Sequence, residues 1–428
     1  MNREQLDEAV EHAPIAAVQV AVSPFDDRAL RGGVIERCVE RGIAVMAHSP
    51  LGGPRRASRL ARIPELAEIA EAHGATAAEV ALAWLLALAP NVVAIPGATR
   101  PETARSAARA ASLHVAEDEL EGLDVALGRP RATPPRRARA AKGGEVVVVM
   151  GIPGAGKTRV AQEYVGRGYL RLNRDERGGT LRELANELDE ALATGSKRVV
   201  LDNTYLTRAS RSYVLQVAAR HGAAARCVWL ETPLAQAQVN LVERLLDRYG
   251  DLPGPERLAE LARSEVGVLP PTRQMRALRE LEKPSADEGF AAVEVVSFER
   301  AVRPGAANAG VLVAATAVGV TGWESVLADA SPSSSHLVFD WRPDADEDGD
   351  ELALVVDAIS KVATGLVDAA VCPHPAGPPV CWCRPPLPGL ALAFARARDV
   401  DLSRSVVVGA SPAHRTLANT LGARCLTV

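Results

Sequence analysis

The sequence lacks any apolar run long enough to cross a membrane. The longest run, from Val80 to Ala89, is far shorter than the roughly 20 residues that a transmembrane helix needs. Residues 1–14 also lack the apolar segment of a secretory signal. We therefore expect a cytoplasmic protein that makes no contact with a membrane.

A large excess of charge is also absent. The net charge at pH 7 is −4 and lysine is scarce. These values exclude a protein whose whole surface is strongly basic and binds nucleic acid. Any contact with a polynucleotide must therefore come from a local basic patch. The hydrophobic share of 47% excludes a disordered chain. What remains is an ordinary globular protein.

The length of 428 residues predicts two to four domains. A basic linker rich in proline and glycine spans 129–144, and we predict domains at 1–128, 145–300 and 308–428. Each of them alternates short apolar runs with amphipathic stretches, for example the leucine pattern of 181–195, which predicts a helix. This alternation is typical of α/β folds with parallel sheets.

A glycine-rich motif follows the apolar run EVVVVM, in which we predict a buried strand. Gly151, Gly154 and Gly156 let successive backbone N–H groups wrap the phosphates of a nucleotide. Lys157 then reaches the β- and γ-phosphates, and Thr158 ligates Mg²⁺. A strand before this motif and a helix after it predict a P-loop NTPase domain that binds ATP and Mg²⁺.

Further motifs follow in a fixed order. They are Asn173-Arg174-Asp175, the strand end Asp202-Asn203-Thr204, the run 236–240 (GlnAlaGlnValAsn), Arg244, the run 273–276 (ArgGlnMetArg), and the run 287–290 (AspGluGlyPhe). In this order they resemble the 5′-kinase domain of polynucleotide kinases.

The resemblance implies roles for two side chains. Asp175 would accept the proton of an attacking 5′-hydroxyl, and Arg244 would neutralise charge on the transferring phosphoryl group. From its place at a strand end, Asp202 either contacts magnesium-bound water or is a turn residue. The family's first basic residue of the lid is replaced by Val242.

The prediction for this domain is ATP-dependent phosphoryl transfer to a 5′-hydroxyl end of RNA or DNA. Basic and acidic residues are equally numerous between 145 and 300, so no strong field attracts a long polyanion. A kinase acting on a small hydroxyl compound, and a non-catalytic scaffold that binds ATP or NADP, are therefore alternatives.

Three strand–loop segments precede this domain, at 19–25 (QVAVSPF), 47–53 (AHSPLGG) and 93–102 (VAIPGATRPE). In this order they resemble the C-terminal half of the barrel of aldo/keto reductases. The resemblance implies an NADP site at the corresponding residues, namely Gln19, Ser49, Leu51, Thr99 and Arg100. Part of a TIM barrel is the fold that it implies for 1–128.

The same segment lacks the chemistry of its family. No tyrosine and no lysine occur before residue 142, so reduction by the family's mechanism is not expected. Val22 takes the place of the aromatic residue that stacks on nicotinamide, which counts against NADP binding. Because three strands cannot close an eight-stranded barrel, we expect that a first reductase half is missing from the sequence, that a second copy supplies contacts, or that the segment is a docking module.

The third domain carries a Cys-x-His and a Cys-x-Cys pair, and the four side chains satisfy tetrahedral Zn²⁺ with no open position. The predicted structural zinc ligands are Cys372, His374, Cys381 and Cys383. In a reducing compartment such a cluster indicates a metal and not disulfides.

The residues around this cluster resemble the zinc-loop branch of haloacid-dehalogenase-type (HAD) phosphatases. Pro385 stands at the position of that family's lysine, while Ala410 and His414 hold its acidic positions. The resemblance therefore implies a degenerate HAD-like, Rossmann-type fold for 308–428 without phosphatase activity.

Overall fold

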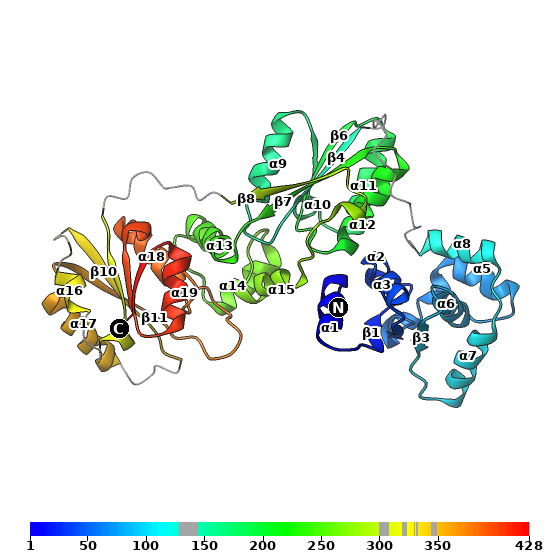
Figure 1. Ribbon diagram of the computed structural model, residues 1–428, viewed down its shortest axis with the longest axis horizontal. Helices are drawn as coiled ribbons and strands as arrows, with labels where there is room; N and C mark the ends of the chain where they lie inside the picture. The colour runs from blue at the N-terminus through cyan, green and yellow to red at the C-terminus, as the bar shows by residue number, and fades with distance from the viewer. Residues whose placement is uncertain are drawn as a thin grey trace. The chain divides into compact units, whose positions relative to one another are not determined.

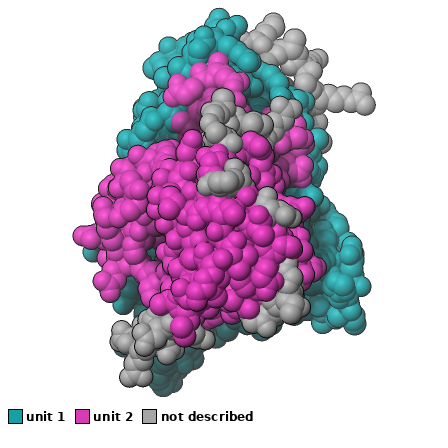
Figure 2. All heavy atoms as spheres, turned by 90° about the vertical axis from the view of Figure 1, so that its left-hand side faces the viewer, with its two compact units in different colours: residues 1–148, 164–228, 280–294 teal, residues 149–163, 229–279, 295–428 magenta. Residues whose placement is uncertain are grey.

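The computed structural model describes residues 1–127, 144–298, 308–318, 323–328, 330, 333–343 and 349–427. These residues form two compact units, which Figure 2 shows in separate colours. Unit 1 comprises residues 1–148, 164–228 and 280–294, and unit 2 comprises 149–163, 229–279 and 295–428. The unit boundaries thus cross the predicted 145–300 domain, and the predicted division stays a prediction. The predicted linker 129–144, apart from Gly144, lies outside the described residues.

A parallel sheet of three strands in the order β1-β2-β3 lies in the first part of unit 1 (Figure 1). The strands are β1 (Ala17–Ala21), β2 (Ala44–His48) and β3 (Val92–Ile95). Side chains alternate between the two faces of the sheet. Val18 and its partner Val45 lie on the buried face, whereas Gln19 and its partner Met46 lie on the exposed face. The helices of this part are α1 (Arg3–His12), α2 (Arg28–Arg31), α3 (Val34–Arg41), α4 (Pro54–Ala57), α5 (Pro64–Ala72), α6 (Ala77–Leu86), α7 (Pro101–Ser112) and α8 (Glu117–Ala126).

The glycine-rich motif follows the central strand of a second sheet. This sheet has five strands in the order β5-β6-β4-β7-β8. Its strands are β4 (Glu145–Met150), β5 (Leu170–Leu172), β6 (Arg198–Asp202), β7 (Ala224–Glu231) and β8 (Ala292–Ser297). The apolar run EVVVVM forms central β4, which is buried from Val146 to Met150. The predicted strand is confirmed. The helices of this region are α9 (Lys157–Gly166), α10 (Arg174–Arg177), α11 (Leu181–Ala193), α12 (Arg208–Arg220), α13 (Leu234–Tyr249), α14 (Pro255–Ser264) and α15 (Pro271–Glu280).

Within unit 1, helix α2 of the first segment contacts α12. The guanidinium of Arg31 is buried there, donates to Ser212 and Gln216 at 3.3 and 3.2 Å, and lies 4.0 Å from the ring centroid of Tyr213. The Tyr213 hydroxyl donates to Asp27 at 3.0 Å. Polar side chains therefore join α2 to α12 within unit 1.

The last part of unit 2 is a five-stranded parallel sheet in the order β11-β10-β9-β12-β13. Its strands are β9 (Val311–Ala314), β10 (Ser334–Trp341), β11 (Gly365–Cys372), β12 (Val406–Gly409) and β13 (Arg424–Thr427). The helices are α16 (Glu324–Ala328), α17 (Gly349–Val362), α18 (Gly389–Arg398) and α19 (Pro412–Leu421). With three parallel sheets among the described residues, the predicted α/β fold class is confirmed.

One hydrophobic core in unit 2 contains both the helices that follow β7 and this last sheet. Leu245 and Leu246 of α13 and Leu258 of α14 belong to the same cluster as Leu312 of β9 and Val408 of β12. Helix α13 contacts both α18 and α19. In the described part of the chain, no helix is both long and apolar enough to cross a membrane.

Candidate functional site

The glycine-rich loop joins β4 to α9, as the motif predicts. The Lys157 ammonium group donates to the carbonyl oxygens of Gly151 and Ile152 at 3.0 and 2.9 Å. Gly154 has φ of +87°, and a Cβ atom built there would lie 2.3 Å from the carbonyl oxygen of Ala237. Only glycine fits this position, because any side chain would clash with α13 and strain the backbone.

Helix α13 holds the loop through the motif of residues 236–240. The Asn240 amide donates to the carbonyl oxygen of Gly154 at 2.8 Å, and Gln236 donates to Asn240 Oδ1 at 3.2 Å. The glutamine and asparagine of this motif therefore fix the backbone of the loop, and the small Ala237 allows the helix to approach it.

Two further side chains hold loop carbonyls. The sequence analysis missed Thr232 and assigned no role to Gln274. The Thr232 hydroxyl donates to Ala155 at 3.1 Å, and the fully buried Gln274 donates to Pro153 at 3.1 Å. Gln274 lies in the motif of residues 273–276, whereas Thr232 belongs to no motif. Their bonds fix the positions of two carbonyl groups of the loop.

A separate polar group in unit 1 positions Asp175. Asn173 caps α10 by accepting from the backbone N–H of Asp175 at 2.7 Å, and its amide donates to the carbonyl oxygen of Asp202 at 2.8 Å. The Asp202 carboxylate is buried and accepts from Arg171 at 2.6 Å. Asp202 therefore anchors the turn that presents Asp175, whose side chain is 47% exposed.

The two predicted lid positions differ in environment. Arg244 is exposed, and its guanidinium donates to the carbonyl oxygen of Gly267 at 3.4 Å. Val242 is fully buried in the shared core of unit 2. A basic side chain at position 242 would place its charge among apolar side chains. Thr158 is exposed on the first turn of α9.

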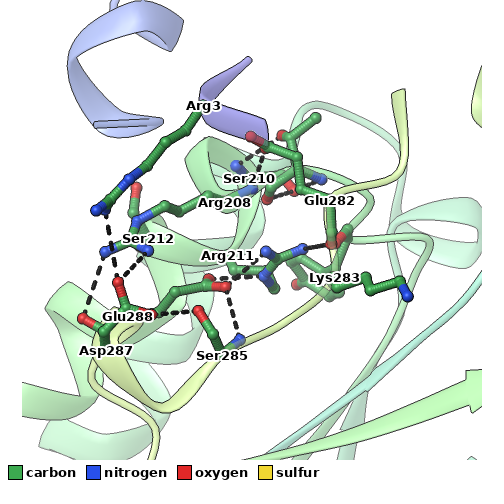
Figure 3. A network of polar contacts seen from close by, with 12 residues as sticks. Arg3, Arg208, Ser210, Arg211, Ser212, Glu282, Lys283, Ser285, Asp287 and Glu288 are labelled. Atoms are coloured by element: carbon green, nitrogen blue, oxygen red, sulfur yellow. Dashed lines mark hydrogen bonds and ion pairs between the residues drawn. The ribbon is translucent and has the colours of Figure 1, made fainter. Parts of the chain in front are cut away.

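The Glu288-Gly289-Phe290 motif has a structural role. Arg211 and Glu288 form a buried two-pronged ion pair with both distances at 2.7 Å (Figure 3). Arg211 also donates to the carbonyl oxygens of Tyr205 and Glu282, each at 3.0 Å. The motif therefore fixes the segment before β8 to α12.

The four predicted zinc ligands form a compact cluster. Their ligand atoms, Sγ of Cys372, Cys381 and Cys383 and Nδ1 of His374, all lie within 4.8 Å of one another. The Cys372 sulfur is 3.6 Å from that of Cys381 and 3.4 Å from that of Cys383. Tetrahedral zinc with Zn–S bonds of about 2.3 Å requires sulfurs about 3.8 Å apart, so the cluster fits the ion.

The thiols of this cluster differ in acidity. Hydrogen bonds from Cys372 and then Cys383 lower the pKa of Cys381 strongly, whereas the interaction with Cys381 raises the pKa of Cys372 to about 11. The lowered pKa of Cys381 favours its thiolate, which is the form that binds a metal.

The predicted NADP residues lie on the three-stranded sheet and its loops. Gln19 is exposed on β1, Ser49 and Leu51 follow β2, and Thr99 and Arg100 follow β3 and are exposed. The loops after β2 and β3 share the carboxyl edge of the sheet, because the strands are parallel. Ser49 has φ of +51°, a conformation uncommon for serine.

Comparison with known proteins identifies two regions. Residues 2–127 match the family model described as aldo/keto reductase family, and residues 146–264 match one described as AAA domain. Pyridoxine 4-dehydrogenase of Escherichia coli is 38% identical over 93 residues, covering 21% of this chain and 30% of that protein. A bifunctional polynucleotide phosphatase/kinase of Schizosaccharomyces pombe is 28% identical over 174 residues, covering 40% of this chain and 38% of that protein.

Among solved structures, the chain matches a thermostable aldo-keto reductase in complex with the inhibitor epalrestat. The sequence identity is 39% and the TM-score is 0.27, with 29% of this chain and 46% of that chain covered. The chain therefore spans less than half the length of each of these three relatives.

These matches confirm the first two resemblances. The aldo/keto reductase match lies at the N-terminal end of this chain, and its correspondence to the C-terminal half of a reductase stays a prediction. The resemblance of 308–428 to HAD-type phosphatases also stays a prediction. The chain thus joins an aldo/keto reductase segment to a P-loop segment that is similar to a polynucleotide phosphatase/kinase.

Proposed function

We propose that the P-loop segment transfers the γ-phosphoryl group of ATP to a 5′-hydroxyl end of RNA or DNA. The observation that carries this proposal is the loop at 151–158, whose carbonyl oxygens are held by α13 and α15. The likeness to a polynucleotide phosphatase/kinase supports the choice of acceptor.

Lys157 and Thr158 are the residues that we assign to the nucleotide. Two loop carbonyls accept from the lysine ammonium, which can exchange them for phosphate oxygens by rotations of its side chain. Thr158, on the first turn of α9, would hold Mg²⁺, an ion that neutralises charge on the phosphates when bound. Arg244 is the candidate for stabilising the transferring group, because it is exposed on α13.

Asp175 is the proposed base. The acceptor oxygen forms a bond to the γ-phosphorus while the bond from that phosphorus to the bridging oxygen breaks, and ADP leaves. The hydroxyl proton passes to the Asp175 carboxylate, which is half exposed and so accessible to an acceptor. Asn173 fixes the backbone that carries it.

The test uses γ-labelled ATP, Mg²⁺ and a panel of 5′-hydroxyl RNA and DNA oligonucleotides. Asp175→Asn should abolish labelling. Glu176→Gln is the matched control, because this neighbouring carboxylate is exposed and bound to Arg171 at 2.6 Å, and it should retain labelling. If Asp175→Asn labels the oligonucleotides as well as Glu176→Gln does, the role of Asp175 as the base is refuted.

The same panel separates the alternative functions. ATP hydrolysis that is stimulated by a small hydroxyl compound, without label on any oligonucleotide, would indicate a small-molecule kinase. ATP binding without turnover would indicate a nucleotide-binding scaffold.

We also propose that the Cys₃His cluster holds one structural Zn²⁺. Four protein ligands leave no open position, so the ion would stabilise the fold and would not act on a substrate. Metal analysis of the purified chain should find about one zinc per chain. Cys383→Ser should lose it and Cys425→Ser, which changes a cysteine outside the cluster, should not.

For the reductase segment, we propose that it performs no hydride transfer, because the family's tyrosine and lysine have no counterpart before residue 142. Incubation with NADPH and a panel of aldehydes should consume no NADPH, and consumption by the purified protein would overturn this proposal. Titration with NADPH separately tests binding at Gln19 and Arg100.

A further inference from the structure

The phosphate-binding loop and the metal cluster are joined through one hydrophobic core in unit 2. On one side, α13 binds the loop through Asn240, which donates to Gly154 at 2.8 Å. On the other side, Leu245 and Leu246 of the same helix lie in the core that contains the last sheet, and the helix contacts α18 and α19. A change in the packing of that sheet can therefore reach the loop.

A more direct connection begins inside the metal cluster. Trp382 stands between the ligands Cys381 and Cys383, and it is 2% exposed. Its indole N–H donates to the carbonyl oxygen of Leu269 at 3.0 Å. Because both neighbours of Trp382 are metal ligands, a bound ion would fix the backbone from which the indole projects.

Leu269 leads directly to α15. It is followed by Pro270 and by Pro271, the first residue of α15, and two successive prolines make a stiff connection. One turn into α15, the fully buried Gln274 donates to the carbonyl oxygen of Pro153 in the phosphate-binding loop at 3.1 Å. The path from the cysteine pair to the loop thus consists of two part-buried hydrogen bonds and one rigid segment.

A second contact runs parallel to this path. Leu252, between α13 and α14, packs against the cysteine cluster and also against the shared core. A Cβ atom on Gly389 would lie 2.9 Å from its Cδ1 atom and 2.4 Å from the carbonyl oxygen of Trp382. Glycine at 389 thus lets α18 lie close to both the metal loop and the α13–α14 connection.

We propose that the bound metal, through Trp382 and Gln274, holds the phosphate-binding loop in the shape that binds nucleotide. Trp382 is then a positioning residue for the nucleotide site. The last sheet of unit 2, together with its metal cluster, stabilises the conformation of the P-loop segment. This inference rests on the proposed nucleotide binding and on the proposed metal site.

The experiment compares Trp382→Phe, Gln274→Met and Trp341→Phe with the wild-type chain, each loaded with Zn²⁺. Trp341→Phe is the matched control, because the Trp341 indole also donates to the metal loop, at the carbonyl oxygen of His374 (2.8 Å), but makes no bond to Leu269. Three quantities are measured: zinc content, affinity for a fluorescent ATP analogue at fixed Mg²⁺, and hydrogen exchange of the amides 151–157 without nucleotide.

Trp382→Phe and Gln274→Met should keep their zinc, bind the analogue about fivefold more weakly, as expected for one lost hydrogen bond, and exchange the loop amides faster. Trp341→Phe, once loaded with zinc, should match the wild type. Removing zinc from the wild type with a zinc-selective chelator should have the same effect as Trp382→Phe.

Unchanged affinity and unchanged loop exchange in both test variants would overturn the inference. If the zinc-loaded wild type does not bind the analogue at all, the proposed function fails. The exchange rates of the loop amides then still decide whether Trp382 and Gln274 brace the loop, because that measurement needs no nucleotide.

Discussion

The side-chain amide of Asn173 donates to the backbone carbonyl oxygen of Asp202 at 2.8 Å, while its oxygen accepts from the backbone N–H of Asp175 at 2.7 Å. One side chain thus ties the end of β6 to the first turn of α10. This arrangement gives the order of the two motifs a physical meaning, because the buried strand end fixes the position of the exposed carboxylate.

We predict that Asn173→Ala lowers phosphoryl transfer by about 10- to 100-fold, because a small displacement of Asp175 misplaces the base. The lost cap should also cost about 1 kcal/mol of stability. Asn173→Asp keeps an oxygen for the cap but sets a carboxylate against buried Asp202, so its activity should fall as well. Turnover and urea unfolding check both variants, and normal turnover in Asn173→Ala would rule out this positioning role.

A second prediction concerns the close approach of Gly154 to α13. Gly154→Ala should abolish measurable ATP binding, since its Cβ atom would lie 2.3 Å from the carbonyl oxygen of Ala237 and φ is +87°. Gly166→Ala, at the end of α9, is the control because no atom lies within 4 Å of the added Cβ. The control should bind ATP normally and gain roughly 0.5–1 kcal/mol in stability. Titration with ATP and thermal unfolding distinguish the two variants.

Local patterns were sufficient to predict the elements of the P-loop segment. The leucine spacing of 181–195 predicted a helix, and the structure places α11 at Leu181–Ala193 with Thr180 as its N-cap. The apolar run before the glycines became central β4. Such signals are read from neighbouring residues, so they need no knowledge of the tertiary fold.

Contacts between distant segments could not be predicted in this way. Gln274 lies 121 residues from Pro153, whose carbonyl oxygen it binds, and the motif of residues 273–276 that contains it gives no sign of this contact. Likewise, the predicted domains 145–300 and 308–428 gave no sign that α13 and the last sheet share a core. The cysteine cluster was predictable because its ligand types and spacing are themselves the signal.

The ion pair of Arg211 and Glu288 gives a third prediction, about stability. Both side chains are almost completely buried, at 0% and 1% exposure, so Glu288→Gln would leave the guanidinium without its charge partner. We expect a loss of about 3–5 kcal/mol in the free energy of unfolding. Asp287→Asn is the control: Asp287 pairs with Arg208 at 2.8 Å but is 56% exposed, and its loss should cost no more than about 1 kcal/mol. If Glu288→Gln and Asp287→Asn lose similar amounts of unfolding free energy in chemical denaturation, the difference in burial that we assign to the two ion pairs is contradicted.

The last prediction concerns His336 on β10 and the pH dependence of stability. His336 is fully buried, its Nδ1 atom accepts from the backbone N–H of Val311 at 3.2 Å, and its Nε2 atom has no hydrogen-bond partner among the described residues. Burial lowers the pKa of this imidazole, since a charged ring would lose its hydration there. The native chain therefore keeps His336 neutral at pH values where the unfolded chain has already bound a proton.

The sign of the effect follows from this difference in bound protons. As pH falls below about 6.5, the unfolded state gains a proton that the native state rejects, so the free energy of unfolding decreases until the lower, native pKa is reached. Above about pH 6.5 both states are neutral and His336 contributes no pH dependence. His336→Asn, which keeps an acceptor for Val311 but cannot be protonated, should remove this part of the slope. Urea unfolding of the wild type and of His336→Asn at about pH 5 and 8 measures this slope. If the difference in unfolding free energy between the two chains is the same at both pH values, His336 is excluded as the titrating group. A difference that shrinks or reverses at the lower pH would identify His336 as that group.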